Sequence, residues 1–109
     1  MKISLRTKEI EADDEFREHV QRRAAFALSR FGDDVKEVEV RLENVNGRRD
    51  GVDKRCSLVV RTRRQFDPIE IETVHEDASA AVDLSFGRAA RTVARKLELH
   101  VASRARSGR

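Results

Sequence analysis

The sequence is short of several residue types, and each shortage excludes a class of protein. Its single cysteine among 109 residues excludes an internal disulfide and favours a reducing compartment. No apolar run at the N-terminus has the form of a signal peptide, and no apolar stretch is long enough to span a membrane. We therefore expect a cytoplasmic protein with no membrane partner, of a size that allows one modest hydrophobic core.

Charged residues make up 39% of the chain, and their distribution is uneven. Residues 1–46 hold 9 basic and 11 acidic residues, whereas residues 47–109 hold 14 basic and 9 acidic ones. Within residues 85–109, seven basic residues stand against Glu98 alone. A basic second half joined to a first half without excess positive charge indicates a polyanionic partner that binds one side of the molecule.

Hydrophobic periodicity predicts four strands and two helices. Alternation of apolar and polar residues predicts strands over residues 2–8, 35–45, 55–63 and 69–74. Apolar residues spaced three and four apart predict one helix from the acidic run 12–15 to Phe31 and another over residues 75–103.

The order β-α-β-β-β-α determines most of the expected topology. A right-handed crossover should make the first two strands parallel neighbours, and the short later connections favour an antiparallel meander. Because each strand has one apolar face, both helices should pack on the same side of the sheet. We predict an α+β two-layer sandwich, a four-stranded sheet with two helices on one face. Residues 1–103 are expected to form a single domain and residues 104–109 a basic tail.

The sequence offers little that would support catalysis. The two glycines of residues 46–51 lack the following Lys-Ser/Thr and helix start of a phosphate-binding loop. Cys56 falls on the core side of its strand, where cysteine behaves as a small apolar residue. His19 and His100 lie on helix flanks and are interpreted as structural. We predict no catalytic residue, cofactor, metal site or small-molecule substrate; an enzymatic alternative rests on Cys56 and His75 alone.

The predicted helix over residues 75–103 has two contrasting faces. Asp77 is expected to cap its N-terminus. The apolar face is formed by Val82, Phe86, Ala89, Val93 and Leu97. Arg88, Arg91 and Arg95 fall together on the opposite side, and Lys96 lies on their flank. One face therefore requires a core to cover it, while the other presents a row of cations.

Two interpretations of this row of cations remain open. Exposed helices often carry arginines that have no specific partner. However, Asp83 near Arg88 and Glu98 near Arg95 are almost the only carboxylates available for pairing along the helix. Unpaired cations repel one another, and arginine suits bidentate contact with phosphate. We therefore favour a phosphate-binding face.

Residues 75–77 (HED) and 80–83 (AAVD), followed by these spaced arginines, give the chain a specific resemblance. Together with the element order, they resemble the ribosome hibernation promoting factor and ribosome-associated inhibitor family. Residues 17–20 (REHV) and Arg23 fall where the first helix of that family has an Arg-x-x-Val pattern and a cation. The chain departs from the pattern at Ser79, where an aromatic residue is common, and in a longer loop over residues 46–54. A third departure, residues 53–56 (DKRC), resembles a less characterised branch of single-domain relatives. No second, dimerising domain follows, so we expect the short, single-domain form.

The resemblance implies a fold like that of a double-stranded-RNA-binding domain. It also implies a function: binding in the decoding channel of the small ribosomal subunit, where the family blocks mRNA and tRNA and shuts translation down. Our leading hypothesis is a non-enzymatic rRNA-binding protein that docks on the small subunit and restrains translation. The alternative is a protein-interaction or dimerising adaptor of the same fold without ribosome binding, for which a weak homodimer is expected.

The residues expected to contact RNA phosphates fall into two groups. The helix group comprises Arg88, Arg91, Arg95, Lys96, Arg22 and Arg23. The loop and strand group comprises Arg48, Arg49, Lys54, Arg55, Arg61, Arg63 and Arg64. Recognition should depend on RNA shape and backbone, because the helix face has no aromatic residue for base stacking. About six phosphate contacts would give a log–log salt slope of roughly −4 to −5.

Overall fold

The computed structural model describes residues 1–45, 53–64 and 67–107, with side chains described as far as residue 99. Its elements are the strand β1 (Lys2–Lys8), the helix α1 (Asp14–Leu28), the 3-10 helix η1 (Ser29–Asp34), the strands β2 (Val35–Asn44), β3 (Lys54–Thr62) and β4 (Ile69–His75), and the helix α2 (Ala78–Ser107). The predicted α+β order is confirmed.

The four strands form one mixed sheet in the order β1-β2-β3-β4. Strand β1 pairs with β2 in parallel, and the other neighbours are antiparallel, as the connections predicted. One row of paired residues, Leu5, Val40, Leu58 and Ile71, crosses all four strands. A slip of one residue in any strand would turn its apolar residues to solvent, so this row holds the register.

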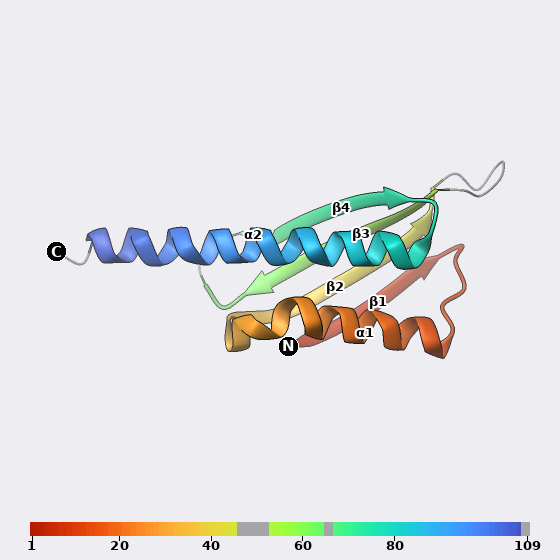
Figure 1. Cartoon of the computed structure of the whole chain (residues 1–109), viewed down its shortest axis with the longest axis horizontal. Helices are drawn as coiled ribbons and strands as arrows, with labels where there is room; N and C mark the ends of the chain where they lie inside the picture. The colour runs from red at the N-terminus through yellow and green to blue at the C-terminus, as the bar shows by residue number, and fades with distance from the viewer. Residues whose placement is uncertain (46–52, 65–66, 108–109) are drawn as a thin grey trace.

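Both helices cover the same face of the sheet and lie side by side (Figure 1). From α2, the side chains of Val82, Phe86, Ala89 and Val93 are fully buried against the strands. Burial of a side chain as large as Phe86 contributes about 1.5–3 kcal/mol. The predicted two-layer arrangement is therefore confirmed, and the opposite face of the sheet is left without a helical cover.

The helices end at different residues from those predicted. The α-helical part of α1 stops at Leu28 rather than Phe31, and η1 continues the chain to Asp34. Gly32, within η1, has φ 57°, a left-handed conformation that reverses the chain and is accessible to glycine at little cost. Helix α2 runs to Ser107, beyond the predicted end at residue 103, so it enters the segment predicted to be a basic tail.

The two helix starts are held by short-range hydrogen bonds. Asp13 caps α1, because its Oδ1 accepts a hydrogen bond of 2.8 Å from the backbone N–H of Phe16. Asp77 directly precedes α2, and its carbonyl accepts a hydrogen bond of 2.9 Å from Ala81 N–H. His75 Nδ1 accepts from Asp77 N–H at 3.0 Å, which fixes the turn from β4 into α2. In the described ranges, neither helix combines the length and apolar character needed to cross a membrane.

Candidate nucleic-acid interface

Arg91 and Arg95 lie on the outward side of α2, away from the sheet. Both side chains are exposed, and neither forms an ion pair within the described parts of the chain. The helical period places them opposite Phe86, Ala89 and Val93, which are fully buried. Lys96 is also exposed but has an interaction partner, so we do not count it as an unpaired cation. Two arginines thus offer unpaired guanidinium groups to solvent.

Arg88 is exposed but anchors α2 to the edge strand β4. Its Nη1 donates a hydrogen bond of 2.7 Å to the backbone carbonyl of Glu72 and another of 3.2 Å to Thr73 Oγ1. A charged donor to a backbone carbonyl forms one of the stronger protein hydrogen bonds. Arg88 therefore has a structural task that Arg91 and Arg95 do not share.

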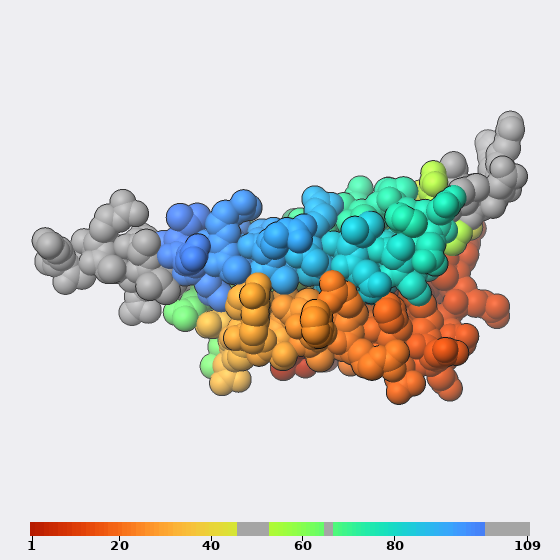
Figure 2. Space-filling model, viewed as in Figure 1, coloured from red at the N-terminus to blue at the C-terminus, as the bar shows by residue number. Residues whose placement is uncertain are grey.

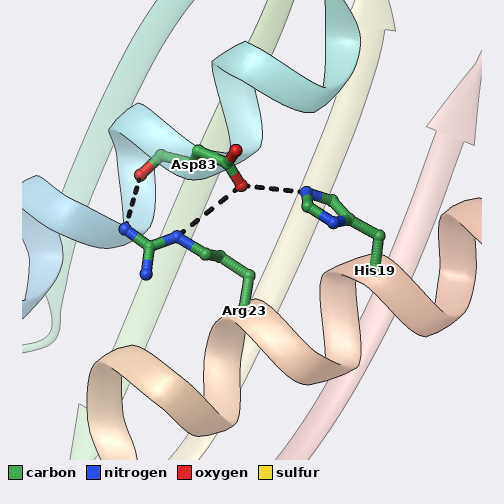
Figure 3. A network of polar contacts seen from close by, with 3 residues as sticks. All are labelled: His19, Arg23 and Asp83. Atoms are coloured by element: carbon green, nitrogen blue, oxygen red, sulfur yellow. Dashed lines mark hydrogen bonds and ion pairs between the residues drawn. The ribbon is translucent and has the colours of Figure 1, made fainter.

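His19, Arg23 and Asp83 connect the two helices (Figure 3). Asp83 Oδ1 on α2 lies 2.9 Å from His19 Nε2 and 3.6 Å from Arg23 Nε, both on α1. Arg23 Nη2 also donates to the Asp83 carbonyl at 3.4 Å. The expectation that Asp83 lies near Arg88 is wrong, because the two positions are about 140° apart around the helix and Asp83 faces α1. The interpretation of His19 as structural agrees with this contact.

Arg23 and Arg91 approach each other across Gly87. A Cβ atom at Gly87 would lie 3.8 Å from Arg23 Nη2 and 3.8 Å from Arg91 Nη1. Both guanidinium groups therefore lie over the same stretch of α2 backbone, at van der Waals distance from this position. Figure 2 shows the outward surfaces of α1 (orange) and α2 (cyan to blue) meeting along this side of the molecule. Two of the predicted helix cations, Arg23 of α1 and Arg91 of α2, are thus brought together from two elements.

Arg22 extends the cationic surface along α1. Its guanidinium lies 3.9 Å from the carboxylate of Glu18, one turn earlier, and its side chain is 65% exposed. An exposed ion pair at this distance contributes little, about 0.3–0.5 kcal/mol at most for helix neighbours. The guanidinium of Arg22 can therefore leave the carboxylate of Glu18 and form an ion pair with an external anion.

Phe26 is the residue of this surface that the sequence analysis did not assign. It is 81% exposed on α1, and the guanidinium carbon of Arg23 lies 5.3 Å from its ring centroid. An exposed ring beside a cation is a surface on which an unpaired nucleobase can stack. The predicted lack of an aromatic residue concerned the outward face of α2, and Phe26 adds an exposed ring from α1. The signal in the sequence was its position off the apolar stripe of α1.

Two of the predicted strand cations are paired with carboxylates of the neighbouring strand β2. Arg55 Nη2 lies 2.6 Å from Glu43 Oε1, and its Nε donates to the same oxygen at 3.2 Å. This hydrogen bond lowers the pKa of Glu43 and raises that of Arg55. Arg61 lies 3.5 Å from Glu37 and 3.3 Å from Glu39. Both arginines point to the open face of the sheet, away from the helices.

The structure describes three of the remaining members of the loop and strand group, Arg63, Arg64 and Lys54. Arg64 Nε donates to Asp34 Oδ1 at 3.0 Å. Arg63 is exposed, and Lys54 has an interaction partner. Arg48 and Arg49 lie outside the described residues. The cations that converge are those of α1 and α2, and these form the candidate interface.

The residues behind the enzymatic alternative do not form a reactive site. Cys56 is fully buried in the core, and this burial raises the pKa of its thiol, which disfavours the nucleophilic thiolate. His75 is engaged at the start of α2, through the hydrogen bond to Asp77 described above. Among the described residues, no three His, Cys, Asp or Glu side chains are grouped so as to hold a metal ion.

The chain is similar to known ribosomal proteins. The model of the family described as "Sigma 54 modulation protein / S30EA ribosomal protein" matches residues 3–99. No curated protein has a significantly similar sequence. Among solved structures, the Protein Y N-terminal domain of Thermus thermophilus is 24% identical, with a TM-score of 0.71 over 87% of this chain and 98% of that one. A ribosomal subunit interface protein from Coxiella burnetii is 12% identical, with a TM-score of 0.74 over 90% of this chain and 99% of that one.

Proposed function

Because the chain belongs to the Sigma 54 modulation protein / S30EA ribosomal protein family, we propose that it is an RNA-binding protein that docks on the small ribosomal subunit and restrains translation. As a ribosome-binding protein, it would act in the cytoplasm. It would take part in the stress response, under conditions in which translation is reduced. Its RNA-binding surface is the outward side of α1 and α2, within residues 1–103. It acts by occupying space and needs no catalytic group.

The observation that carries this proposal is that Arg91 and Arg95 are exposed and form no ion pair with any residue that the structure describes, with Arg91 close to Arg23. Surface arginines without a carboxylate partner repel each other, and a phosphate backbone removes that repulsion while releasing its own counterions. The neighbouring Arg22 and Phe26 enlarge the surface with a weakly held cation and an exposed ring. Such a surface suits an rRNA segment whose phosphates contact the arginines and whose unpaired base reaches Phe26 on α1.

Co-sedimentation with ribosomes through a sucrose gradient at two salt concentrations tests this proposal. The variant is Arg91→Glu combined with Arg95→Glu, which leaves the buried face of α2 unchanged. We expect the wild-type protein to travel with the small subunit and the variant to remain at the top of the gradient. Loss of two phosphate contacts should also reduce the log–log salt slope by roughly 1.4–1.8.

The matched control reverses two cations that lie away from the helices. Lys2 and Lys36 are exposed on β1 and β2, so Lys2→Glu combined with Lys36→Glu makes the same change in net charge. This control should still co-sediment with ribosomes. Equal losses in both double variants would mean that net charge alone drives binding. Unchanged sedimentation of the Arg91→Glu and Arg95→Glu protein, with its thermal unfolding also unchanged, would exclude the helix face as the interface.

The alternative is an adaptor that binds another protein or a second copy of itself through the open face of the sheet. The observation in its favour is that neither α1 nor α2, the α-helices of the described ranges, covers this face, on which Val74 is 51% exposed. Gradient fractions without ribosome association, together with a dimer that forms as concentration rises in analytical ultracentrifugation, would favour the adaptor. A monomer that co-sediments with the small subunit would exclude it.

A further inference from the structure

The open face of the sheet carries a hollow that the proposed ribosome interface does not use. It has a volume of about 230 Å³ and is lined by side chains of three strands: Ser4 and Arg6 of β1, Arg41 of β2, and Ser57 and Val59 of β3. Glu39 stands at its wall. The helices pack on the other face, so this hollow is separate from the cations of α1 and α2.

The cations of the hollow are held together by strand register. Arg6 of β1 is the direct cross-strand partner of Arg41 of β2, and Arg41 is in turn the partner of Ser57 on β3. Like charges on directly opposed residues destabilise a sheet. Neither arginine forms a hydrogen bond or an ion pair among the described residues. The fold therefore sets these two arginines in direct register on neighbouring strands, and among the described residues no counter-charge is bonded to either.

The carboxylates on this face relieve the repulsion only in part, because Glu43 and Glu39 are each paired with an arginine of β3. Glu43 binds Arg55 at 2.6 Å, so its attraction to Arg41 acts only over a longer range. Glu39 lies 3.3 Å from Arg61. Strand β3 thus supplies arginines that pair with the carboxylates of β2, whereas Arg6 and Arg41 have no bonded carboxylate among the described residues.

We propose that this hollow binds the phosphate group of a small phosphate monoester that carries hydroxyl groups, such as a sugar phosphate or a mononucleotide. Two guanidinium groups match the charge of a phosphate dianion and can each donate two hydrogen bonds to its oxygens. The hydroxyls of Ser4 and Ser57 add neutral donors. The carboxylate of Glu39 at the wall accepts a hydrogen bond from a ligand hydroxyl, and Val59 provides an apolar contact.

The other charges of the face favour a small ligand over a nucleic acid. Glu70 and Glu72 of the edge strand β4 are exposed beside the hollow, and Glu72 is the cross-strand partner of Ser57. A phosphate backbone that crossed the sheet would pass these carboxylates and be repelled. A ligand confined to the hollow avoids them.

Titration of the full chain, followed by amide chemical shifts in NMR spectra, tests this proposal. The probes are ribose 5-phosphate, adenosine 5′-monophosphate, inorganic phosphate and adenosine. We expect the two monoesters to give saturable shifts in residues 4–6, 39–41 and 57–59, with inorganic phosphate weaker and adenosine without effect. Saturation by adenosine 5′-monophosphate alone would identify a nucleotide, and saturation by both monoesters a sugar phosphate; either result supports the site.

Two variants complete the experiment. Arg6→Gln combined with Arg41→Gln should weaken monoester binding at least tenfold while leaving ribosome co-sedimentation unchanged. Because it removes a repulsion, the double variant should unfold at the same temperature as the wild type or higher. Arg91→Gln combined with Arg95→Gln is the matched control and should bind the monoester normally. The proposal is overturned if the wild type shows no saturable shift, if adenosine binds equally well, or if the shifts map to α2 and vanish in the control.

Discussion

The guanidinium groups of Arg23 and Arg91 approach the same point above the backbone of Gly87, one from each helix. Asp83 compensates the charge of Arg23 only in part, because it lies 3.6 Å away and also contacts His19 at 2.9 Å. Arg91 has no ion pair in the described part of the chain. In the proposed complex, the seam between the helices is therefore where we expect an rRNA phosphate to contact both helices at once.

The first prediction compares alanine substitutions at Gly87, in a regular helix, and at Gly32, where φ is positive. Gly87→Ala places a methyl group 3.8 Å from both guanidiniums, an ordinary van der Waals distance, within a regular helix. We expect it to increase the free energy of unfolding by about 0.5–1 kcal/mol and to leave RNA binding intact. Chemical denaturation and ribosome co-sedimentation measure the two effects. Gly32→Ala is the control: nothing lies within 4 Å of its Cβ, but φ is +57°, so it should destabilise by about 1–2 kcal/mol.

The second prediction separates the roles of two exposed arginines on α2. Arg88→Ala removes the hydrogen bonds to Glu72 and Thr73 and should destabilise the fold by about 1 kcal/mol. Arg91→Ala removes no such contact, so its effect on stability should stay within about 0.5 kcal/mol while RNA affinity falls. Urea denaturation of both variants, with binding to an rRNA fragment measured in parallel, gives the comparison. If Arg91→Ala proved the more destabilising of the two, the assignment of roles would be reversed.

The third prediction addresses Phe26, whose ring is 81% exposed. If a nucleobase stacks on it, Phe26→Ala should weaken binding of the rRNA fragment by about 1–3 kcal/mol, or roughly fivefold to 150-fold, without changing thermal stability. Phe26→Trp should preserve binding. Leu84→Ala is the matched loss of an exposed apolar side chain, since Leu84 is 50% exposed on α2. Equal effects of the two alanine variants would contradict stacking.

Local patterns predicted the fold well because each strand has a single apolar face. Val38, Val40 and Leu42 alternate with charged residues, and all three are buried as that alternation predicts. The end of α1 was placed too late. Gly32 marks the reversal of the chain, but the change from α-helix to 3-10 helix after Leu28 depends on how β2 is reached, which no local signal encodes.

The candidate site was less predictable, because its decisive contacts join residues far apart in sequence. Asp83 meets His19 and Arg23 across 64 and 60 positions, whereas the sequence suggested a neighbour on its own helix. The pairing of Arg55 with Glu43 follows from cross-strand register, in which they are direct partners. The register depends on the connection between the strands, which the sequence did not define. Arg55 was therefore predicted to be available to RNA. Helical periodicity did find Arg91 and Arg95, since their exposure requires only the position of the apolar stripe.

The last prediction uses the pair formed by Glu43 and Arg55. The hydrogen bond from Arg55 lowers the pKa of Glu43 below its ordinary value of 4.5, so the folded protein holds the carboxylate more strongly deprotonated than the unfolded chain does. The pair therefore adds stability above pH 4.5, and this contribution is lost as the pH falls through the lower, folded-state pKa. Glu43→Gln should unfold at a lower temperature than the wild type near neutral pH, and the difference should shrink in acid.

Thermal unfolding of both proteins across the acid range measures this difference. Glu70→Gln is the control, because it removes an exposed carboxylate that has no ion pair among the described residues of the same face. Its unfolding temperature should follow that of the wild type at every pH. If the gap between the wild type and Glu43→Gln stayed constant down to the acid limit, the loss would reflect packing of the side chain. A gap that closes below pH 4.5 ties the loss to the charge of Glu43 and to its bond with Arg55.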